Sequence, residues 1–178
     1  ATTAEKDVAS DLLLEMYYLR GFLMLQKNKP RSAEMSFSIF LRLFSIYSKT
    51  NTVQSIRVKL EIVKIIMTRR RFREMEPFIA KVLEILTDET DPEQTLLKAH
   101  CYQLLAEYHR EIGNWDTAIT NGKKCLELLQ ASQFENFDVA DLKRDLAKNF
   151  IKISQGLILV NRLTPVSDIL EQTVKIVQ

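Results

Sequence analysis

The sequence contains few of the residues that interrupt helices or build tight turns. Its 178 residues include four glycines and four prolines. Gly and Pro dominate the turns of β-rich proteins, so their scarcity excludes a fold built from many short strands. The abundance of Leu, Ile, Lys and Glu favours long helices joined by short connections. The composition therefore predicts an all-α protein.

Cysteine and net charge are also low. The two cysteines, Cys101 and Cys125, lie within apolar helical patterns and not in loops. This placement argues against a disulfide framework and predicts buried, reduced thiols in an intracellular protein of the cytoplasm or nucleus. The formal net charge of +2 is not the concentrated basic excess that most proteins binding nucleic acid or anionic membranes carry.

Long apolar runs are absent. The most apolar stretch, residues 12–25, is interrupted by Glu15 and Arg20, whereas a membrane-spanning helix needs about 18 apolar residues in a row. The first ten residues carry no signal-peptide pattern. The sequence starts without methionine and ends at Gln178 inside an apolar-periodic segment without a capping residue. We therefore expect a piece of a longer protein that does not insert into membranes.

No set of residues that could carry catalysis is evident. His100 and His109 are nine positions apart on one expected helix, so they point to roughly opposite faces and cannot share a metal ion. Neither cysteine is accompanied by a histidine and an acid. Glycine-rich phosphate loops are missing, and the acidic segment 87–93 lacks the glycine and the spacing of a calcium loop. We expect no enzymatic activity, no cofactor and no metal site.

The chain does contain apolar residues that recur at intervals of three and four, the pattern of amphipathic helices. This pattern predicts four antiparallel helix pairs in a single domain of residues 1–178, because hairpins of this kind bury their apolar faces by stacking in a solenoid. The expected repeats cover about 6–48, 51–87, 91–131 and 137–178. Their helices are expected at about 6–28 and 30–47, 53–69 and 72–86, 91–112 and 115–130, and 138–160 and 165–178.

Two helix starts have recognisable capping residues. Asp91, Pro92 and Gln94 predict the N-cap, first and third positions of one helix. Thr164 and Pro165 predict the cap and first position of the last helix.

The third helix pair resembles the tetratricopeptide repeat (TPR), which places small residues where its two helices meet and aromatic residues beside them. The matching residues are Tyr102, Leu105, Ala106, Gly113, Trp115, Ala118 and Cys125. His109 and Gly122 stand where the repeat usually has aromatic residues. The resemblance implies a right-handed solenoid of helical hairpins.

The other pairs follow this pattern less closely. The first pair matches it at Tyr17, Gly21, Ala33 and Phe37, and the last pair keeps only the pattern of residue sizes. The period of about 42 residues is longer than the ordinary 34. These degenerate, long-period repeats are similar to those of kinesin light chains and of peptide-sensing bacterial regulators. The stacked helical hairpins of proteasome-lid and signalosome subunits, which share this size and periodicity, are an alternative fold.

The register of the second pair has two solutions. One frame starts its second helix at Phe72 and aligns Met75 with the small residues of the other repeats. That frame places Pro77 inside the helix, where proline removes a donor and clashes with the preceding turn. The alternative starts the helix at Glu76.

The TPR resemblance implies a concave surface, lined by the first helix of each pair, that holds a peptide or a helix of a partner. Mapped onto this sequence, the lining is mixed apolar and basic: Tyr18, Phe22, Leu25, Arg57, Leu60, Lys64, Met67, His100, Gln103, Glu107, Arg110, Lys148, Ile151, Gln155 and Ile158. It predicts a scaffold or adaptor that binds an amphipathic, carboxylate-bearing protein segment within a larger complex. A peptide-sensing regulatory domain is an alternative function. Tyr18 and Phe22 have an alternative role as core residues.

Arg69, Arg70, Arg71 and Arg73 form a basic patch with two interpretations. Cations are favourable at the carboxyl end of a helix. Alternatively, these residues bind carboxylates or phosphates of a partner, which would make the chain a nucleic-acid-binding repeat. Phe72 is the one aromatic residue among them, whereas proteins that bind single strands usually present several, so nucleic acid is disfavoured. The apolar faces at both ends of the chain are candidate surfaces for self-association.

Overall fold

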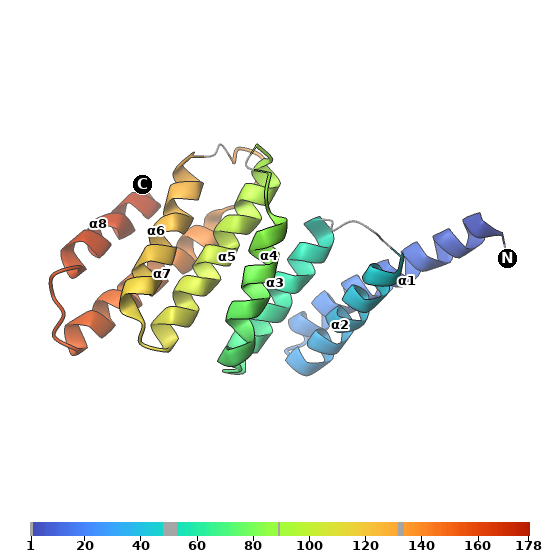
Figure 1. Cartoon of the computed structure of the whole chain (residues 1–178), viewed down its shortest axis with the longest axis horizontal. Coiled ribbons are helices and arrows are strands. Elements are labelled where there is room, and N and C mark those ends of the chain that lie inside the picture. Colours follow the sequence, from blue (N-terminus) through green and yellow to red (C-terminus); the bar gives the residue numbers. More distant parts are fainter. Residues whose placement is uncertain (1, 48–52, 89, 132–133) are drawn as a thin grey trace. The chain divides into compact units, whose positions relative to one another are not determined.

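The computed structural model describes residues 2–47, 53–88, 90–131 and 134–178. These residues form eight α-helices and one 3-10 helix (Figure 1). In chain order they are α1 (Thr3–Gln26), α2 (Pro30–Tyr47), α3 (Val53–Thr68), η1 (Phe72–Glu74), α4 (Met75–Ile85), α5 (Pro92–Glu111), α6 (Trp115–Ala131), α7 (Ala140–Leu159) and α8 (Val166–Val177). The described part of the chain contains no strand, and the all-α prediction is confirmed.

The chain divides into two compact units, Ala1–Arg71 and Phe72–Gln178. The division falls between α3 and η1, inside the range 51–87 expected for the second repeat. The limits 48 and 51 expected for the first and second repeats lie outside the described residues.

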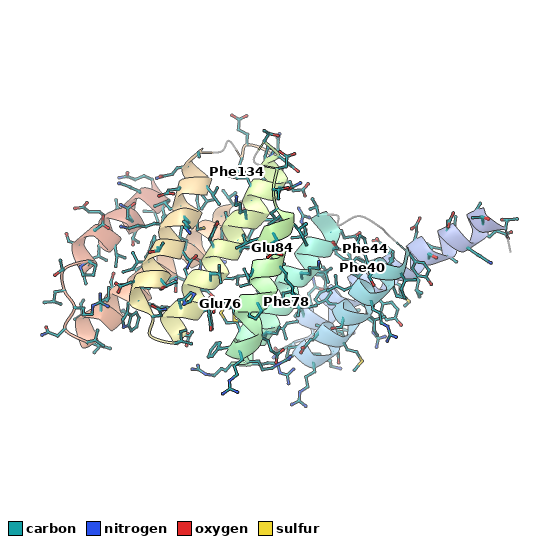
Figure 2. The ribbon with its side chains drawn as sticks, in the orientation of Figure 1. Phe40, Phe44, Glu76, Phe78, Glu84 and Phe134 are labelled. Carbon is teal, nitrogen blue, oxygen red and sulfur yellow. The ribbon has the colours of Figure 1, made fainter. Side chains whose placement is uncertain are left out.

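In the first unit, α1 and α2 lie side by side as an antiparallel pair, and α2 also packs against α3 (Figure 1). Phe37 and Phe40 of α2 are fully buried. Phe40 stacks on Phe44, with ring centroids 5.7 Å apart, as labelled in Figure 2. On α1, Gly21 leaves room for Phe37, because a Cβ atom at this glycine would lie 2.1 Å from the Phe37 ring.

In the second unit, α5 pairs with α6 and α7 pairs with α8, while α5 and α6 both pack against α7 and α4 packs against α5. Two glycines allow α6 and α7 to approach closely. A Cβ atom at Gly122 of α6 would lie 2.5 Å from the Phe150 ring, and one at Gly156 of α7 would lie 2.3 Å from the Trp115 ring. Small residues thus receive large aromatic ones where helices meet, as the TPR resemblance implies.

The first helix of each expected pair ends in the same kind of turn. The second residue after each of these helices adopts a left-handed φ, between 53° and 76°. These residues are Asn28, Arg70, Gly113 and Asn161. The N–H of the next residue then donates to the carbonyl five positions back, over 2.8–3.0 Å. This Schellman turn satisfies carbonyls that the helix end leaves open. It is a repeated feature that the sequence revealed only at Gly113, because the other three turns use no glycine.

The two predicted helix starts have different outcomes. Asp91 is the N-cap of α5, its Oδ1 accepts from the Glu93 N–H over 2.9 Å, and Pro92 is the first residue, as predicted. Gln94 is the third residue, also as predicted, and its side chain accepts from the Asp88 N–H over 3.3 Å. The prediction for Thr164 was wrong. Pro165 is the N-cap of α8, because the Val166 N–H that a Thr164 cap would bind already donates to the Leu163 carbonyl over 3.1 Å.

The second pair follows neither register fully. Residues 72–74 form η1, so the helix expected from Phe72 is a 3-10 turn followed by α4 from Met75. Pro77 is therefore the third residue of α4, within the first turn, where a backbone N–H has no partner inside the helix. The alternative start at Glu76 was wrong by one residue. The helices expected from residues 6 and 138 begin at Thr3 and Ala140.

Candidate functional site

A charged pocket of about 130 Å³ lies between α5 and α7 in the second unit. Helical spacing gathers its side chains, because residues three, four and seven positions apart share one face of a helix. Its lining residues are Glu107, Arg110, Asp145, Lys148, Asn149 and Lys152. Three cations and two carboxylates therefore surround a small volume.

Two side-chain hydrogen bonds orient the amides at this pocket. The Gln103 Nε2 donates to Glu107 Oε1 over 2.8 Å, and the Arg110 Nε donates to Asn149 Oδ1 over 2.5 Å. Gln103 and Asn149 are buried, 3% and 1% exposed. With these atoms engaged, the Gln103 Oε1 and the Asn149 Nδ2 have no hydrogen-bond partner in the described part of the chain. An unsatisfied buried polar group typically costs about 1–3 kcal/mol, so these two atoms are notable.

Burial also affects the ionisation of Glu107, one of the two acidic residues of the pocket. Desolvation raises the pKa of the Glu107 carboxyl above its usual value, and the nearby Asp145 carboxylate adds to this effect. The Gln103 hydrogen bond and the charges of Arg110 and Lys152 oppose it. Glu107 is thus a carboxylate that has lost much of its hydration, and within the described residues no direct ion pair replaces it.

Beyond the pocket, α7 carries exposed apolar side chains. Ile151 and Ile158 of α7 are 42% and 53% exposed, and Gln155 between them is exposed as well. These residues continue the helical face that begins with Lys148. The face is therefore basic at one end and carries two exposed isoleucines, with a glutamine between them, along the turns that follow.

A second pocket, of about 210 Å³, lies within the first unit, where α1 ends and α3 nears its end. Lys64 and Glu61 pair across 3.0 Å beside it. Leu25 and Ile65 supply its large apolar side chains. The full lining is Leu25, Asn28, Pro30, Glu61, Lys64, Ile65 and Thr68.

The predicted surface residues divide between pockets, core and open surface. Leu25 and Lys64 line one pocket, and Glu107, Arg110 and Lys148 line the other. Leu60 and Gln103 are buried. Arg57 is exposed, while Met67 and His100 are partly buried.

Tyr18 and Phe22 have a packing role. Tyr18 lies edge-on to Phe22, with ring centroids 4.9 Å apart, and 5.8 Å from the ring of Phe40. Phe22 in turn lies 5.1 Å from the ring of Phe37. These contacts favour the core interpretation of both residues.

Several pocket residues were missed. Asp145 lies three positions before Lys148, Lys152 lies four after it, and Asn149 lies four after Asp145, so helical spacing could have identified all three as one group with Lys148. The expected lining took about one residue per helical turn and passed over them. Asn28, Pro30 and Thr68 of the other pocket lie at or near helix ends, where periodicity gives no guidance.

The basic patch is partly neutralised within the first unit. The Arg69 Nη1 lies 2.8 Å from Glu34 Oε2, and the Arg71 Nη1 lies 2.6 Å from Glu34 Oε1. One carboxylate on α2 thus holds two arginines that follow α3. Arg70 adopts the left-handed turn conformation, and Arg73 is an exposed residue of η1. These contacts favour the structural interpretation of the patch.

Both thiols and the His109 imidazole are buried and placed for packing. Cys101 and Cys125 are buried, and desolvation raises the pKa of each thiol to about 12, so both are neutral. His109 is 7% exposed, packs against the Tyr108 ring at 4.8 Å and lies 3.8 Å from Glu76. Among the residues that the structure describes, no group of three His, Cys, Asp or Glu is placed to hold a metal ion. No helix in the described ranges is long and apolar enough to cross a membrane.

Comparison with known proteins gives a match of fold. No protein-family model and no curated protein matches the sequence. The crystal structure of BtubC (BKLC) from P. vanneervenii is similar to this chain, with a TM-score of 0.73 and 17% sequence identity. The similarity covers 94% of this chain and 64% of the BtubC chain, so this chain spans less than two thirds of the length of BtubC. At this identity the likeness concerns the fold, and it confirms the expected TPR-like arrangement of sequential antiparallel helix pairs.

Proposed function

We propose that this chain is a non-catalytic helical repeat that binds a segment of a partner protein on the α5–α7 pocket and the adjoining face of α7. One observation carries the proposal. Asn149 is almost completely buried yet lines this pocket, and its Nδ2 donor has no partner among the described residues. A carbonyl or carboxylate oxygen held in the pocket would supply the missing acceptor.

The charges and the apolar residues indicate the chemistry of the partner. Arg110, Lys148 and Lys152 favour a carboxylate on the bound segment. Ile151 and Ile158 favour apolar side chains about one and about three helical turns beyond Lys148. An amphipathic segment with at least one acidic residue satisfies both requirements, with apolar contacts providing affinity and charges providing register.

The pocket of the first unit has a related role in this proposal. Its apolar residues Leu25 and Ile65 suit a single apolar side chain, and Lys64 suits a neighbouring carboxylate. The likeness of fold to BtubC supports a protein-interaction repeat. We place the chain in a multi-protein assembly, as an adaptor with no turnover of its own.

A peptide selection tests this function. Phage-displayed random peptides of about 12 residues would be panned on the intact chain, and the affinity of enriched peptides would be measured by fluorescence anisotropy. Acidic, amphipathic sequences are the expected result. We expect Lys148→Glu and Asn149→Leu each to weaken binding about tenfold or more, equivalent to about 1.4 kcal/mol.

Matched variants control for general effects. Lys143→Glu changes an exposed charge elsewhere on α7. Asn121→Ala removes a buried asparagine of α6, whose Nδ2 already donates to the Thr117 carbonyl over 2.9 Å. Both controls should bind as the wild type does. Failure to enrich any peptide, or equal affinity in the test and control variants, would refute the proposed site.

A further inference from the structure

The helix α1 carries an exposed apolar stripe along most of its length. Val8, Leu12, Met16, Leu19 and Leu23 are between 45% and 66% exposed. Monomeric proteins seldom leave a continuous row of this kind in water.

The stripe lies on the side of α1 that faces away from α2. Gly21 marks the packed side, because a Cβ atom there would overlap the Phe37 ring. At about 100° per residue, Leu12 lies about 180° and Leu23 about 200° around the helix from Gly21. Figure 1 shows that the amino-terminal turns of α1 run past the end of α2, and residues 3–9 are all exposed. No described helix of the first unit covers this face.

The spacing within the stripe is that of a coiled-coil seam. Leu12, Met16, Leu19 and Leu23 are separated by four, three and four residues, which assigns them to positions d, a, d and a of a heptad. Leu12 and Leu19 at the d positions are the residue type that parallel two-stranded coiled coils use there, while Met16 and Leu23 occupy the a positions in place of the usual β-branched residues.

The charges beside the seam fit a second copy of the same helix. Glu15 occupies position g and Arg20 position e of this heptad, one on each side of the stripe, and both are exposed. In a parallel pair, a g residue meets the e residue of the other helix five positions further along. Glu15 therefore meets Arg20 of a second copy, and the symmetry of the pair forms this contact twice. Within the described residues neither side chain takes part in an ion pair.

We propose that α1 binds α1 of a second copy of this chain as a parallel coiled coil. The occupant is a second copy because the seam is flanked by its own complementary charges in the register that a parallel pair requires. In an antiparallel pair, g residues meet g residues and e residues meet e residues, so the same charges give no such complementarity. The inference is independent of the function proposed for α5 and α7.

Sedimentation equilibrium of the intact chain over a range of concentrations tests the proposal. We expect a monomer–dimer equilibrium for the wild type. Glu15→Arg and Arg20→Glu should each raise the dimer dissociation constant about tenfold, since each places like charges opposite one another. The double variant should restore the wild-type value, and an equimolar mixture of the two single variants should form mixed dimers.

A substitution within the seam provides a second, stronger test. Leu19→Glu should abolish the dimer, while Met35→Glu, at an equally exposed apolar residue of α2, should leave it intact. Circular dichroism should give the same helix content for all variants, because the changed residues are exposed. A wild-type chain that stays monomeric at every concentration, or a dimer that survives Leu19→Glu, would overturn the proposal.

Discussion

Single glycines determine how closely the helices of this protein approach. In three places a helix glycine faces the ring of a large aromatic residue on the neighbouring helix at a distance that leaves no room for a Cβ atom. The pairs are Gly21 with Phe37, Gly122 with Phe150, and Gly156 with Trp115. Glycine lowers intrinsic helix stability by about 1 kcal/mol relative to alanine, so its use inside a helix needs a packing reason of this kind.

The pair of Gly21 and Phe37 yields a direct prediction. Gly21→Ala should lower the free energy of unfolding by about 1–3 kcal/mol, because the added methyl group overpacks the contact with the ring. Equilibrium urea denaturation measures this change. The double variant with Phe37→Leu should lose less than the sum of the two single losses, since the smaller side chain makes room for the methyl group. Strict additivity, or a stabilising Gly21→Ala, would contradict the observed packing.

Glu107 yields a prediction about pH. Burial raises its pKa in the folded state, so folding favours the protonated form, and the carboxylate lowers stability when the pH is above the folded pKa. This effect vanishes as the pH falls below the ordinary unfolded value of about 4.3. Glu107→Gln should therefore stabilise the chain at pH 7 and not below pH 4, measured by thermal unfolding. The exposed Glu127→Gln is the control. An equal gain at both pH values would show that charge burial is not the cause.

The helix ends of the repeats use one turn with different residues. Gly113 is the only glycine among the four left-handed positions, and a Cβ atom there would meet nothing within 4 Å. The cost of a side chain at Gly113 is therefore purely conformational. We expect Gly113→Ala to destabilise by about 1 kcal/mol and Gly113→Asn by less, because asparagine tolerates this conformation. Chemical denaturation of both variants measures the difference, and an equal loss for Ala and Asn would argue against the turn.

The contact between α2 and the end of α3 depends on Glu34. Glu34→Ala leaves Arg69 and Arg71 without the carboxylate that they share, so we expect a loss of about 1–2 kcal/mol. The loss should shrink at high salt, since screening weakens the wild-type contact. Unfolding of Glu34→Ala and of Glu34→Gln at low and high ionic strength measures it. No loss in either variant would mean that the arginines are available for another partner.

For the molecule as a whole, the succession of helices was predictable from the sequence, but not the exact start of every helix. The succession of helices, the start of α5 at Pro92 and the turn at Gly113 follow from residues a few positions apart. The structured turn η1 was not foreseen, because the proline that limits α4 permits several starts within one turn. The start of α8 was also predicted wrongly. The Val166 N–H, which a Thr164 cap would bind, donates to the Leu163 carbonyl.

The candidate site, too, could be predicted from the sequence only in part. The TPR resemblance, mapped onto the helical spacing of the sequence, singled out Glu107, Arg110 and Lys148 on the first helices of their pairs, because helical spacing is a local property. The contact of Arg110 with Asn149 joins residues 39 positions apart, and the contact of Arg71 with Glu34 joins residues 37 positions apart. Such contacts depend on which faces of distant helices pack together. Local periodicity therefore determined the helices and their apolar faces, whereas packing between helices determined which charges are paired and which buried amide atoms have no hydrogen-bond partner among the described residues.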